Sequence, residues 1–258
     1  MRTLKNFWAA GRSAYGVWSG LDDPIAVETM GRSGFDFVVI DLQHGFASVA
    51  SSPALLSALE HTEAIPVVRV PWNTPHLIMR SLDLGASAII VPLVNNGAEA
   101  ALAADACRYA PAGNRSWGPL WTNPGRPPIE AAAGDEKATC IAMIETAAGF
   151  ANRSEIASTD GIHALYVGPN DLSLSLGLGR TPHQNSAQLH DAIGQIIEAA
   201  HAAGIAAGVD CSGSADAQHW CDLGADFVIS HTDTVLLRTA AEAAARAVHA
   251  NPIEGTRS

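Results

Sequence analysis

Short apolar runs rich in β-branched residues alternate with longer segments rich in alanine and leucine along the whole chain. This alternation is typical of parallel strands joined by helices. Most of the runs are continuously apolar, which indicates strands that are covered on both faces. The pattern predicts eight strands, over Tyr15 to Trp18, Phe35 to Asp41, Pro66 to Val70, Ala88 to Val94, Cys140 to Glu145, Ala164 to Val167, Ala206 to Val209 and Phe227 to Ser230.

Helix boundaries carry their own signals. Asp23-Pro24 and Thr74-Pro75 each place a capping oxygen before a proline at the first helical position. A glycine suited to a left-handed helix end precedes five of the strands: Gly34, Gly85, Gly161, Gly204 and Gly224. Eight repeats in 258 residues without a linker favour one (β/α)8 TIM barrel over residues 1–258 rather than an open doubly wound sheet.

Two segments depart from the repeat. Residues 110–134 are rich in proline and glycine and contain Trp117 and Trp121. Because long ordered loops often cover a site, we expect this loop to cover the active site, with a plain surface insertion as the alternative. Residues 235–250 are alanine-rich and predict an amphipathic C-terminal helix.

Composition narrows the class of protein. With 48% hydrophobic and 16% charged residues the chain can bury a large core, which excludes a disordered protein. The net charge of −11 would repel a phosphate backbone, so we expect no nucleic-acid partner. No apolar run is long enough for a membrane span, and residues 1–20 lack the pattern of a signal peptide. Four scattered cysteines without a CxxC pair predict a cytoplasmic protein.

Polar residues that end the apolar runs are the candidates for chemistry, because barrel enzymes react at the carboxyl ends of their strands. If the count of strands is right, three acids, a histidine and an arginine converge on one mouth. These five residues are Asp41 and His44 after the second strand, Arg69 in the third, Glu145 after the fifth and Asp171 after the sixth. Gln43, Gly168 and Asn170 stand beside them at the same strand ends.

Glu145 and Asp171 are candidate metal ligands. Two carboxylates with several waters commonly hold a hard cation such as Mg²⁺ or Mn²⁺. Zinc fits poorly, since no histidine or cysteine ends those strands. The alternatives are structural: Glu145 as a carboxylate at a helix N-terminus, and Asp171 as an N-cap.

His44 and Arg69 are candidates for proton transfer and anion binding. His44 stands in an Asp-x-x-His spacing, although a histidine in such a loop is often an ordinary hydrogen-bonding residue. Arg69 lies in a run that should be buried, and a buried guanidinium needs an anionic partner. That partner is either a carboxylate such as Asp41 or Asp83, or a substrate carboxylate. No lysine stands in a strand, so carbon–carbon bond chemistry here should depend on a metal rather than on a Schiff base.

The sequence resembles the HpcH/HpaI family of class II pyruvate-type aldolases, which includes 4-hydroxy-2-oxoheptanedioate and 2-keto-3-deoxy sugar acid aldolases. The resemblance covers nearly the whole chain. Its carriers are the segments 35–44, 66–70, 85–92, 114–119, 143–146 and 167–173.

The resemblance implies a lyase that cleaves 4-hydroxy-2-oxo acids to pyruvate, or hydroxypyruvate, and an aldehyde. It implies that Glu145 and Asp171 hold Mg²⁺ or Mn²⁺, with Co²⁺ possible, and that His44, backed by Asp83, handles protons. Arg69 would stabilise the enolate oxygen. The backbone around Gly168, Asn170 and Asp171 would bind the substrate carboxylate, and Trp18 and Gln43 would line the pocket.

Three positions depart from the family pattern. Relatives often carry Glu at Gln43, Gln at Met143, and an apolar residue at Asp210. We expect Asp210 to favour a polyhydroxylated aldehyde or a hydroxypyruvate-type donor. The resemblance also implies a homo-oligomer, a trimer or hexamer, built through the last helix, and the alternative is an eighth barrel helix packed on its own chain. Two other functions stay open, a CoA-ester lyase of the citramalyl or malyl type and a non-catalytic anion-binding barrel.

Overall fold

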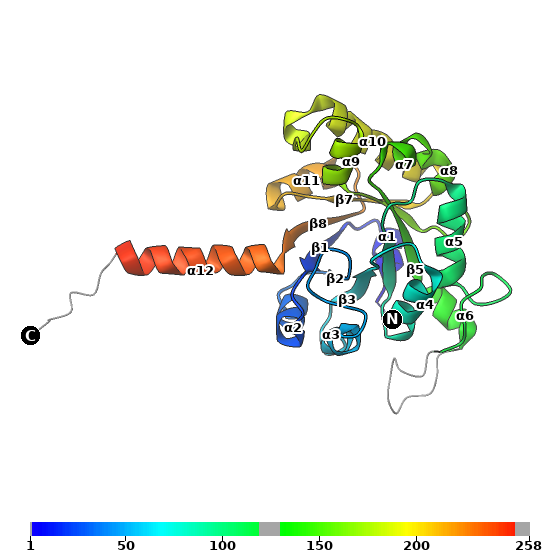
Figure 1. Cartoon of the computed structure of the whole chain (residues 1–258), viewed down its shortest axis with the longest axis horizontal. Coiled ribbons are helices and arrows are strands. Elements are labelled where there is room, and N and C mark those ends of the chain that lie inside the picture. Colours follow the sequence, from blue (N-terminus) through cyan, green and yellow to red (C-terminus); the bar gives the residue numbers. More distant parts are fainter. Residues whose placement is uncertain (1, 119–129, 251–258) are drawn as a thin grey trace, which may run out of the picture.

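The computed structural model describes residues 2–118 and 130–250. Eight parallel strands follow one another in chain order around a closed barrel, and β1 pairs with β8 to close it (Figure 1). This confirms the predicted (β/α)8 barrel. The strands are β1 (Ala14–Ser19), β2 (Phe37–Asp41), β3 (Ile65–Arg69), β4 (Ala88–Val91), β5 (Thr139–Ile144), β6 (Ala164–Val167), β7 (Ala206–Asp210) and β8 (Phe227–Thr232).

The chain also forms helices, most of which surround the barrel and cover the outer faces of its strands, while the last helix projects away from it (Figure 1). They are α1 (Leu4–Ala9), α2 (Pro24–Arg32), α3 (Ser52–Leu59), α4 (Pro75–Asp83), α5 (Gly97–Cys107), α6 (Ala131–Lys137), α7 (Ala147–Ala151), α8 (Arg153–Ala157), α9 (Pro169–Ser175), the 3-10 turn η2 (His183–Asn185), α10 (Ala187–Ala202), α11 (Ser214–Asp222) and α12 (Asp233–Ala250).

The eight predicted strands all form, with ends that shift by a few residues. The largest difference is at β4, which ends at Val91 rather than Val94. Leu93 adopts a left-handed backbone with φ of 55°, and this conformation cannot continue a strand. The five predicted glycines all adopt positive φ at helix ends. Asp23 caps α2 as expected, whereas the side chain of Thr74 makes no capping hydrogen bond.

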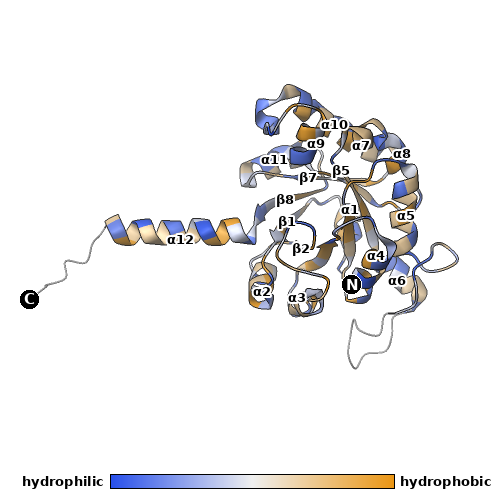
Figure 2. Ribbon diagram, in the orientation of Figure 1, coloured by the Kyte–Doolittle hydropathy of each residue, from blue (hydrophilic) through white to orange (hydrophobic). Residues whose placement is uncertain are grey.

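The apolar core has two layers, one inside the barrel and one between the strands and the helices. Two glycines make room for the large aromatic rings of the inner layer. A Cβ atom at Gly16 would lie 2.2 Å from the Phe37 ring, and one at Gly208 would lie 2.3 Å from Phe227. Figure 2 shows the strands as largely hydrophobic, with hydrophilic positions distributed over the helices. The barrel is therefore a packed body that supports a site at its rim.

The proline-rich segment 110–134 is only partly described, and residues 119–129 lie outside the described residues. Helix α6 begins at Ala131, within the predicted loop. The segment connects α5 to β5, so both of its flanks lie at the end of the barrel where strands begin, opposite the mouth. That the loop covers a site stays a prediction.

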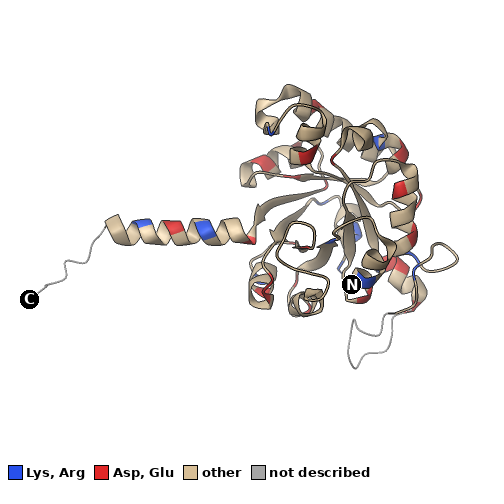
Figure 3. Cartoon of the chain, viewed as in Figure 1, with Lys and Arg blue, Asp and Glu red and all other residues tan. Residues whose placement is uncertain are grey.

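Helix α12 projects away from the barrel, and its acidic and basic residues alternate along its length (Figures 1 and 3). Asp233 at its start is buried, but every residue from Leu237 to Ala250 is exposed. The alternative of a last helix packed on its own chain is therefore wrong, because this helix leaves the barrel after its first turn. No helix in the described ranges has the length and apolar character needed to cross a membrane.

Candidate active site

A cavity of about 320 Å³ opens at the carboxyl ends of the strands. Its walls come from β1, β2, β3, β5, β7 and β8, from the segments that follow β1 and β2, and from the beginnings of α9 after β6 and α12 after β8. Its lining residues are Trp18, Gly20, Asp41, His44, Gly45, Phe46, Arg69, Met143, Gly168, Asn170, Asp171, Asp210, Thr232 and Thr234. The mouth thus brings together most of the residues that the sequence predicted. Gln43, Asp83 and Glu145 are not among the lining residues.

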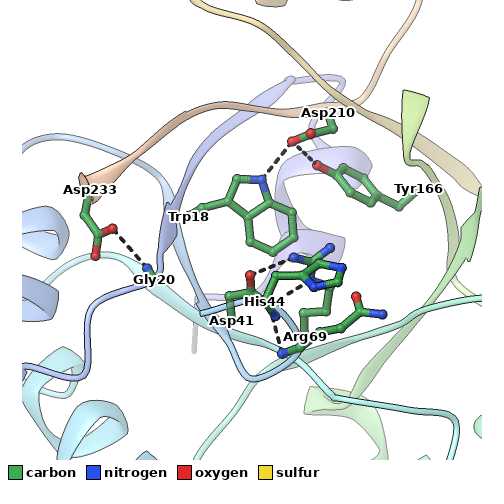
Figure 4. Close-up of polar contacts among 9 residues, drawn as sticks. Trp18, Gly20, Asp41, His44, Arg69, Tyr166, Asp210 and Asp233 are labelled. Atoms are coloured by element: carbon green, nitrogen blue, oxygen red, sulfur yellow. Dashed lines mark hydrogen bonds and ion pairs between the residues drawn. The ribbon is translucent and has the colours of Figure 1, made fainter. Parts of the chain in front are cut away.

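Arg69 and Asp41 form a buried ion pair across neighbouring strands. Arg69 donates from Nε to Asp41 Oδ1 at 2.9 Å and from Nη2 to Oδ2 at 2.6 Å (Figure 4). The Arg69 guanidinium also lies 4.3 Å from the centre of the Trp18 ring. Burial favours the neutral form, yet the hydrogen bonds and charge of Asp41 raise the pKa of Arg69 above its ordinary value. Of the predicted partners, the carboxylate that Arg69 binds within the chain is therefore Asp41.

The same Asp41 carboxylate shapes the loop that carries His44. Its Oδ1 accepts hydrogen bonds from the backbone N–H groups of Gln43 at 3.0 Å and His44 at 3.3 Å. Gly45 is required in this turn, since a Cβ there would lie 2.3 Å from the Asp41 carbonyl oxygen. The Asp-x-x-His spacing thus fixes the backbone of His44, and leaves its ring exposed at the cavity.

Gln43 and Asp83 do not lie where the sequence analysis placed them, as a residue lining the pocket and as the residue that backs His44. The side-chain oxygen of Gln43 is buried and has no hydrogen-bond partner among the described residues. Asp83 ends α4 and accepts a hydrogen bond from Arg115 Nη2 at 2.9 Å. Because α4 runs back toward the beginnings of the strands, Asp83 lies at the end of the barrel opposite His44. Within the described part of this chain, no hydrogen bond joins Asp83 to His44.

Asp210 is the centre of a second polar group on the wall of the cavity. Its Oδ1 accepts hydrogen bonds from Trp18 Nε1 at 2.7 Å and from the Tyr166 hydroxyl at 3.0 Å (Figure 4). Burial raises the pKa of Asp210, although both hydrogen bonds and the charge of Arg69 act in the opposite direction. Sequence reasoning missed Tyr166, whose signal is a single hydroxyl-bearing residue within the apolar run of β6.

Glu145 lies just behind the cavity wall, with 2% of its surface exposed. Its Oε1 accepts a hydrogen bond from the Leu93 N–H at 2.8 Å, and its Oε2 lies 2.9 Å from where a Cβ on Gly168 would stand. Burial, with the negative charge of Asp171 as a smaller cause, raises the pKa of Glu145 to about 7. The Leu93 hydrogen bond and the charge of Arg69 oppose this shift.

The N-cap alternative for Asp171 is wrong, and Glu145 is the residue before the N-cap of α7. Thr146 caps α7, while the carboxylate of Glu145 accepts a hydrogen bond from the N–H of Leu93, two residues after the end of β4. Gly168 is the N-cap of α9, and Asp171 is the third residue of that helix. Neither carboxylate is therefore the N-cap of the helix that follows it.

A hard divalent cation fits this donor set. Glu145 is a buried carboxylate whose charge is disfavoured by burial and by a neighbouring carboxylate, and a cation would compensate both effects. The described residues hold no group of three or more histidine, cysteine or acidic side chains arranged for a metal. A site of two carboxylates completed by water or substrate oxygens suits Mg²⁺ or Mn²⁺ better than zinc.

Asp233, the first residue of α12, forms hydrogen bonds that connect this helix to the rim of the cavity. Sequence reasoning missed this residue. Its buried carboxylate accepts a hydrogen bond from the backbone N–H of Gly20 (Figure 4). It also accepts hydrogen bonds from the Ser19 hydroxyl and from the backbone N–H groups of Leu21 and Thr234. Gly20 and Thr234 both line the cavity. The sequence signal was an aspartate directly after β8, at the start of the last helix.

Comparisons with known proteins identify the family of this chain. Residues 14–240 match the model of the family described as HpcH/HpaI aldolase/citrate lyase. A hydroxypyruvate/pyruvate aldolase of Rhizorhabdus wittichii is 38% identical and covers 93% of this chain and 96% of its own. A 4-hydroxy-2-oxo-heptane-1,7-dioate aldolase of Klebsiella pneumoniae is 37% identical, with coverages of 95% and 94%.

Solved structures give the same fold. A citrate synthase is similar at a TM-score of 0.87 and 29% identity, covering 98% of this chain and 99% of its own. A more distant protein of Mycobacterium tuberculosis, solved in complex with magnesium and pyruvate, shares the fold at a TM-score of 0.59 and 20% identity, with 86% of each chain covered. From the match over residues 14–240 and the two aldolase relatives, we conclude that this chain is a carbon–carbon lyase of the HpcH/HpaI aldolase/citrate lyase family.

Proposed function

We propose that this aldolase cleaves and forms 4-hydroxy-2-oxo acids, with pyruvate or hydroxypyruvate as one partner and an aldehyde as the other. The observation that carries the proposal is the meeting of three features at one rim: a buried carboxylate at Glu145, a second carboxylate at Asp171, and the Arg69 guanidinium. The names of the two aldolase relatives support this choice of substrates.

Glu145 and Asp171 would hold a divalent metal, Mg²⁺ or Mn²⁺, with Co²⁺ as a further candidate. When bound, such a metal polarises the 2-oxo group and acidifies the neighbouring C–H bond. The backbone N–H groups around Gly168, Asn170 and Asp171 would receive the substrate carboxylate, since they lie at the beginning of α9 and at the cavity wall.

Arg69 would stabilise the oxygen that gains negative charge as the carbon–carbon bond breaks. Its Nε and Nη2 are bound to Asp41, but no described residue accepts a hydrogen bond from Nη1. The fixed guanidinium can therefore offer one donor to the substrate without losing its anchor. Trp18 stacks on the guanidinium and limits its movement.

His44 would carry the proton between the 4-hydroxyl group of the substrate and the surroundings. Its exposed ring reaches the cavity from a backbone fixed by Asp41. Because Asp83 lies at the other end of its own barrel, an Asp83 that backs His44 would have to come from a second copy of the chain.

A homo-oligomer, a trimer or hexamer, is part of the proposal. Helix α12 projects with exposed apolar side chains, including Leu237 and Val248 at 62% exposure each, and an isolated apolar face of this kind is typical of a helix that packs on a partner. We place the protein in the cytoplasm, since its four cysteines, Cys107, Cys140, Cys211 and Cys221, are all free.

A lyase assay tests the proposal. Purified protein should release pyruvate from a 4-hydroxy-2-oxo acid, lose this activity with EDTA, and regain it with Mg²⁺, Mn²⁺ or Co²⁺. Activity that survives complete chelation would contradict the metal-dependent reaction.

A CoA-ester lyase is disfavoured, because the described lining of the cavity contains one arginine and no lysine to meet the CoA phosphates.

A further inference from the structure

A second cavity adjoins the active-site cavity and shares two of its lining residues. It has a volume of about 430 Å³ and is lined by Asn170 and Asp210, which also line the first cavity. Its other lining residues include Arg180, Gln184 and Ser212. Because the two cavities share Asn170 and Asp210, a substrate in the first cavity that extended past Asp210 would enter the second.

Arg180 is a cation without a partner in the part of the chain that the structure describes. No ion pair or side-chain hydrogen bond joins it to another described residue, although the chain carries a net charge of −11. By contrast, Arg69, Arg108 and Arg115 are all paired with aspartates. An exposed guanidinium in the wall of a cavity is thus available to an anion from outside the chain.

The loop that carries Arg180 is anchored from within. The buried hydroxyl of Ser173, on α9, lies 2.7 Å from the Gly179 carbonyl oxygen and 3.3 Å from that of Thr181, so both neighbours of Arg180 are held. Thr181 also donates its hydroxyl hydrogen to the Leu178 carbonyl at 2.8 Å. Because α9 begins at Pro169, one short helix positions both Asp171 and the Arg180 loop.

The other groups of this cavity are neutral donors or are already bound. Gln184 donates to the Ser212 hydroxyl at 2.9 Å, and Ser212 donates to Asp216 at 3.1 Å. Asp216 is in turn paired with His183 at 2.7 Å. The acid on the near wall, Asp210, is bound to Trp18 and Tyr166. Arg180 is therefore the group left to select the charge of a ligand.

We propose that the cavity between Asp210 and Arg180 is a distal subsite that binds the anionic end of the aldehyde substrate, a carboxylate or a phosphate. This inference rests on the proposed aldolase function. In the addition direction, the aldehyde carbon reacts at the Arg69 end, and its far end lies against Arg180. An anion so far from the reacting carbon contributes mainly to binding, so its loss should appear mainly in KM.

The test compares pairs of aldehydes that differ in the charge of the far end. Addition to pyruvate is measured with succinic semialdehyde against butanal, and with glyceraldehyde 3-phosphate against glyceraldehyde. Arg180→Gln should reduce the charged-to-uncharged ratio of kcat/KM by about 10- to 100-fold for the bound class. Arg180→Lys should retain part of the preference. The two pairs tell a carboxylate site from a phosphate site.

Arg80→Gln is the matched control, since Arg80 is an exposed arginine of α4 and its loss changes the net charge equally. It should leave both ratios at the wild-type value. A wild type that prefers neither charged aldehyde, or equal ratios in the wild type and Arg180→Gln, would overturn the subsite.

Exchange of the pyruvate methyl hydrogens with D₂O reports the donor half of the reaction without any aldehyde. Exchange in the wild type, combined with unaltered aldehyde ratios in Arg180→Gln, overturns the subsite alone. Absence of metal-dependent exchange in the wild type would instead overturn the proposed function, and the subsite with it.

Discussion

Arg69 donates two hydrogen bonds to Asp41, so that a single buried carboxylate fixes the plane of the guanidinium at the rim of the barrel. The same carboxylate holds the backbone of His44. One aspartate thus fixes the side chain of Arg69 and the backbone of His44, two residues that the proposed reaction uses. Removal of either partner should destabilise the fold, because the other would be left as an uncompensated buried charge.

The double role of this pair predicts that stability and activity separate in a mutant cycle. Arg69→Ala should abolish measurable turnover and lower the free energy of unfolding by about 3 kcal/mol, because Asp41 loses its partner. Adding Asp41→Asn should restore much of the stability but none of the activity. Denaturant unfolding and the pyruvate-release assay check both parts. Recovery of activity in the double variant would show that Arg69 is purely structural.

The raised pKa of Glu145 predicts a pH-dependent loss of stability in the metal-free protein. Its pKa is about 7 in the folded chain against an ordinary value of 4.5, so its contribution is fully present below pH 4.5 and is lost as the pH rises through 7. With EDTA present at pH 8, the free energy of unfolding of Glu145→Gln should exceed that of the wild type by about 3 kcal/mol at most, and its melting temperature should be higher. At pH 5 the two proteins should be equally stable.

A control and a metal readout accompany the Glu145 measurement. Glu198→Gln, on the exposed face of α10, should leave the pH dependence unchanged. Mg²⁺ should raise the melting temperature of the wild type and not that of Glu145→Gln, because a ligand that binds the folded state stabilises it. Equal stabilisation of both would place the metal elsewhere.

His163 predicts the opposite pH dependence, at the other end of the barrel. Its Nδ1 accepts a hydrogen bond from the Cys140 N–H at 3.1 Å, and burial lowers the pKa of His163 to about 4. Its contribution to stability is therefore present above pH 6.5 and is lost as the pH falls through 4. His163→Asn keeps an acceptor and should flatten this acid limb in thermal melts, whereas exposed His76→Asn should not. An unchanged limb would contradict the assignment.

The position of Asp83 predicts that active sites are shared between copies. His44→Ala and Asp83→Asn should each be inactive alone. Mixed oligomers formed by co-expression should recover activity in about one quarter of their sites, since half of the copies supply each intact residue. No recovery, with mixed oligomers verified by mass, would show that Asp83 does not complete the site of another copy.

Asp210 should influence which substrate is preferred. Asp210→Asn keeps an oxygen for Trp18 and Tyr166 but removes the charge, and Asp210→Leu removes both acceptors. We expect both variants to lose preference for glyceraldehyde over propanal, and for hydroxypyruvate over pyruvate, by about tenfold. Ratios of kcat/KM measure this. An Asp210→Leu enzyme with the wild-type preference would remove Asp210 from substrate selection.

The sequence by itself determined the barrel and the identity of its rim residues. Continuous apolar runs, helix-end glycines and polar residues after those runs are local signals, and each depends on a few neighbouring residues. They placed Glu145, Asp171, Arg69 and His44 at strand ends, where the closed barrel brings the strand ends to one rim.

The tertiary structure decided which of these groups are partners. Nothing local distinguished Asp41 from Asp83 as the partner of Arg69, because that choice depends on the register between β2 and β3, which sets Asp41 opposite Arg69. The tertiary structure also placed Asp83 at the end of the barrel opposite its own active site and brought Tyr166 and Asp210 together across adjacent strands. It likewise directed α12 away from the barrel. Contacts between residues distant in sequence arise from strand register and helix direction, and these are properties of the assembled barrel.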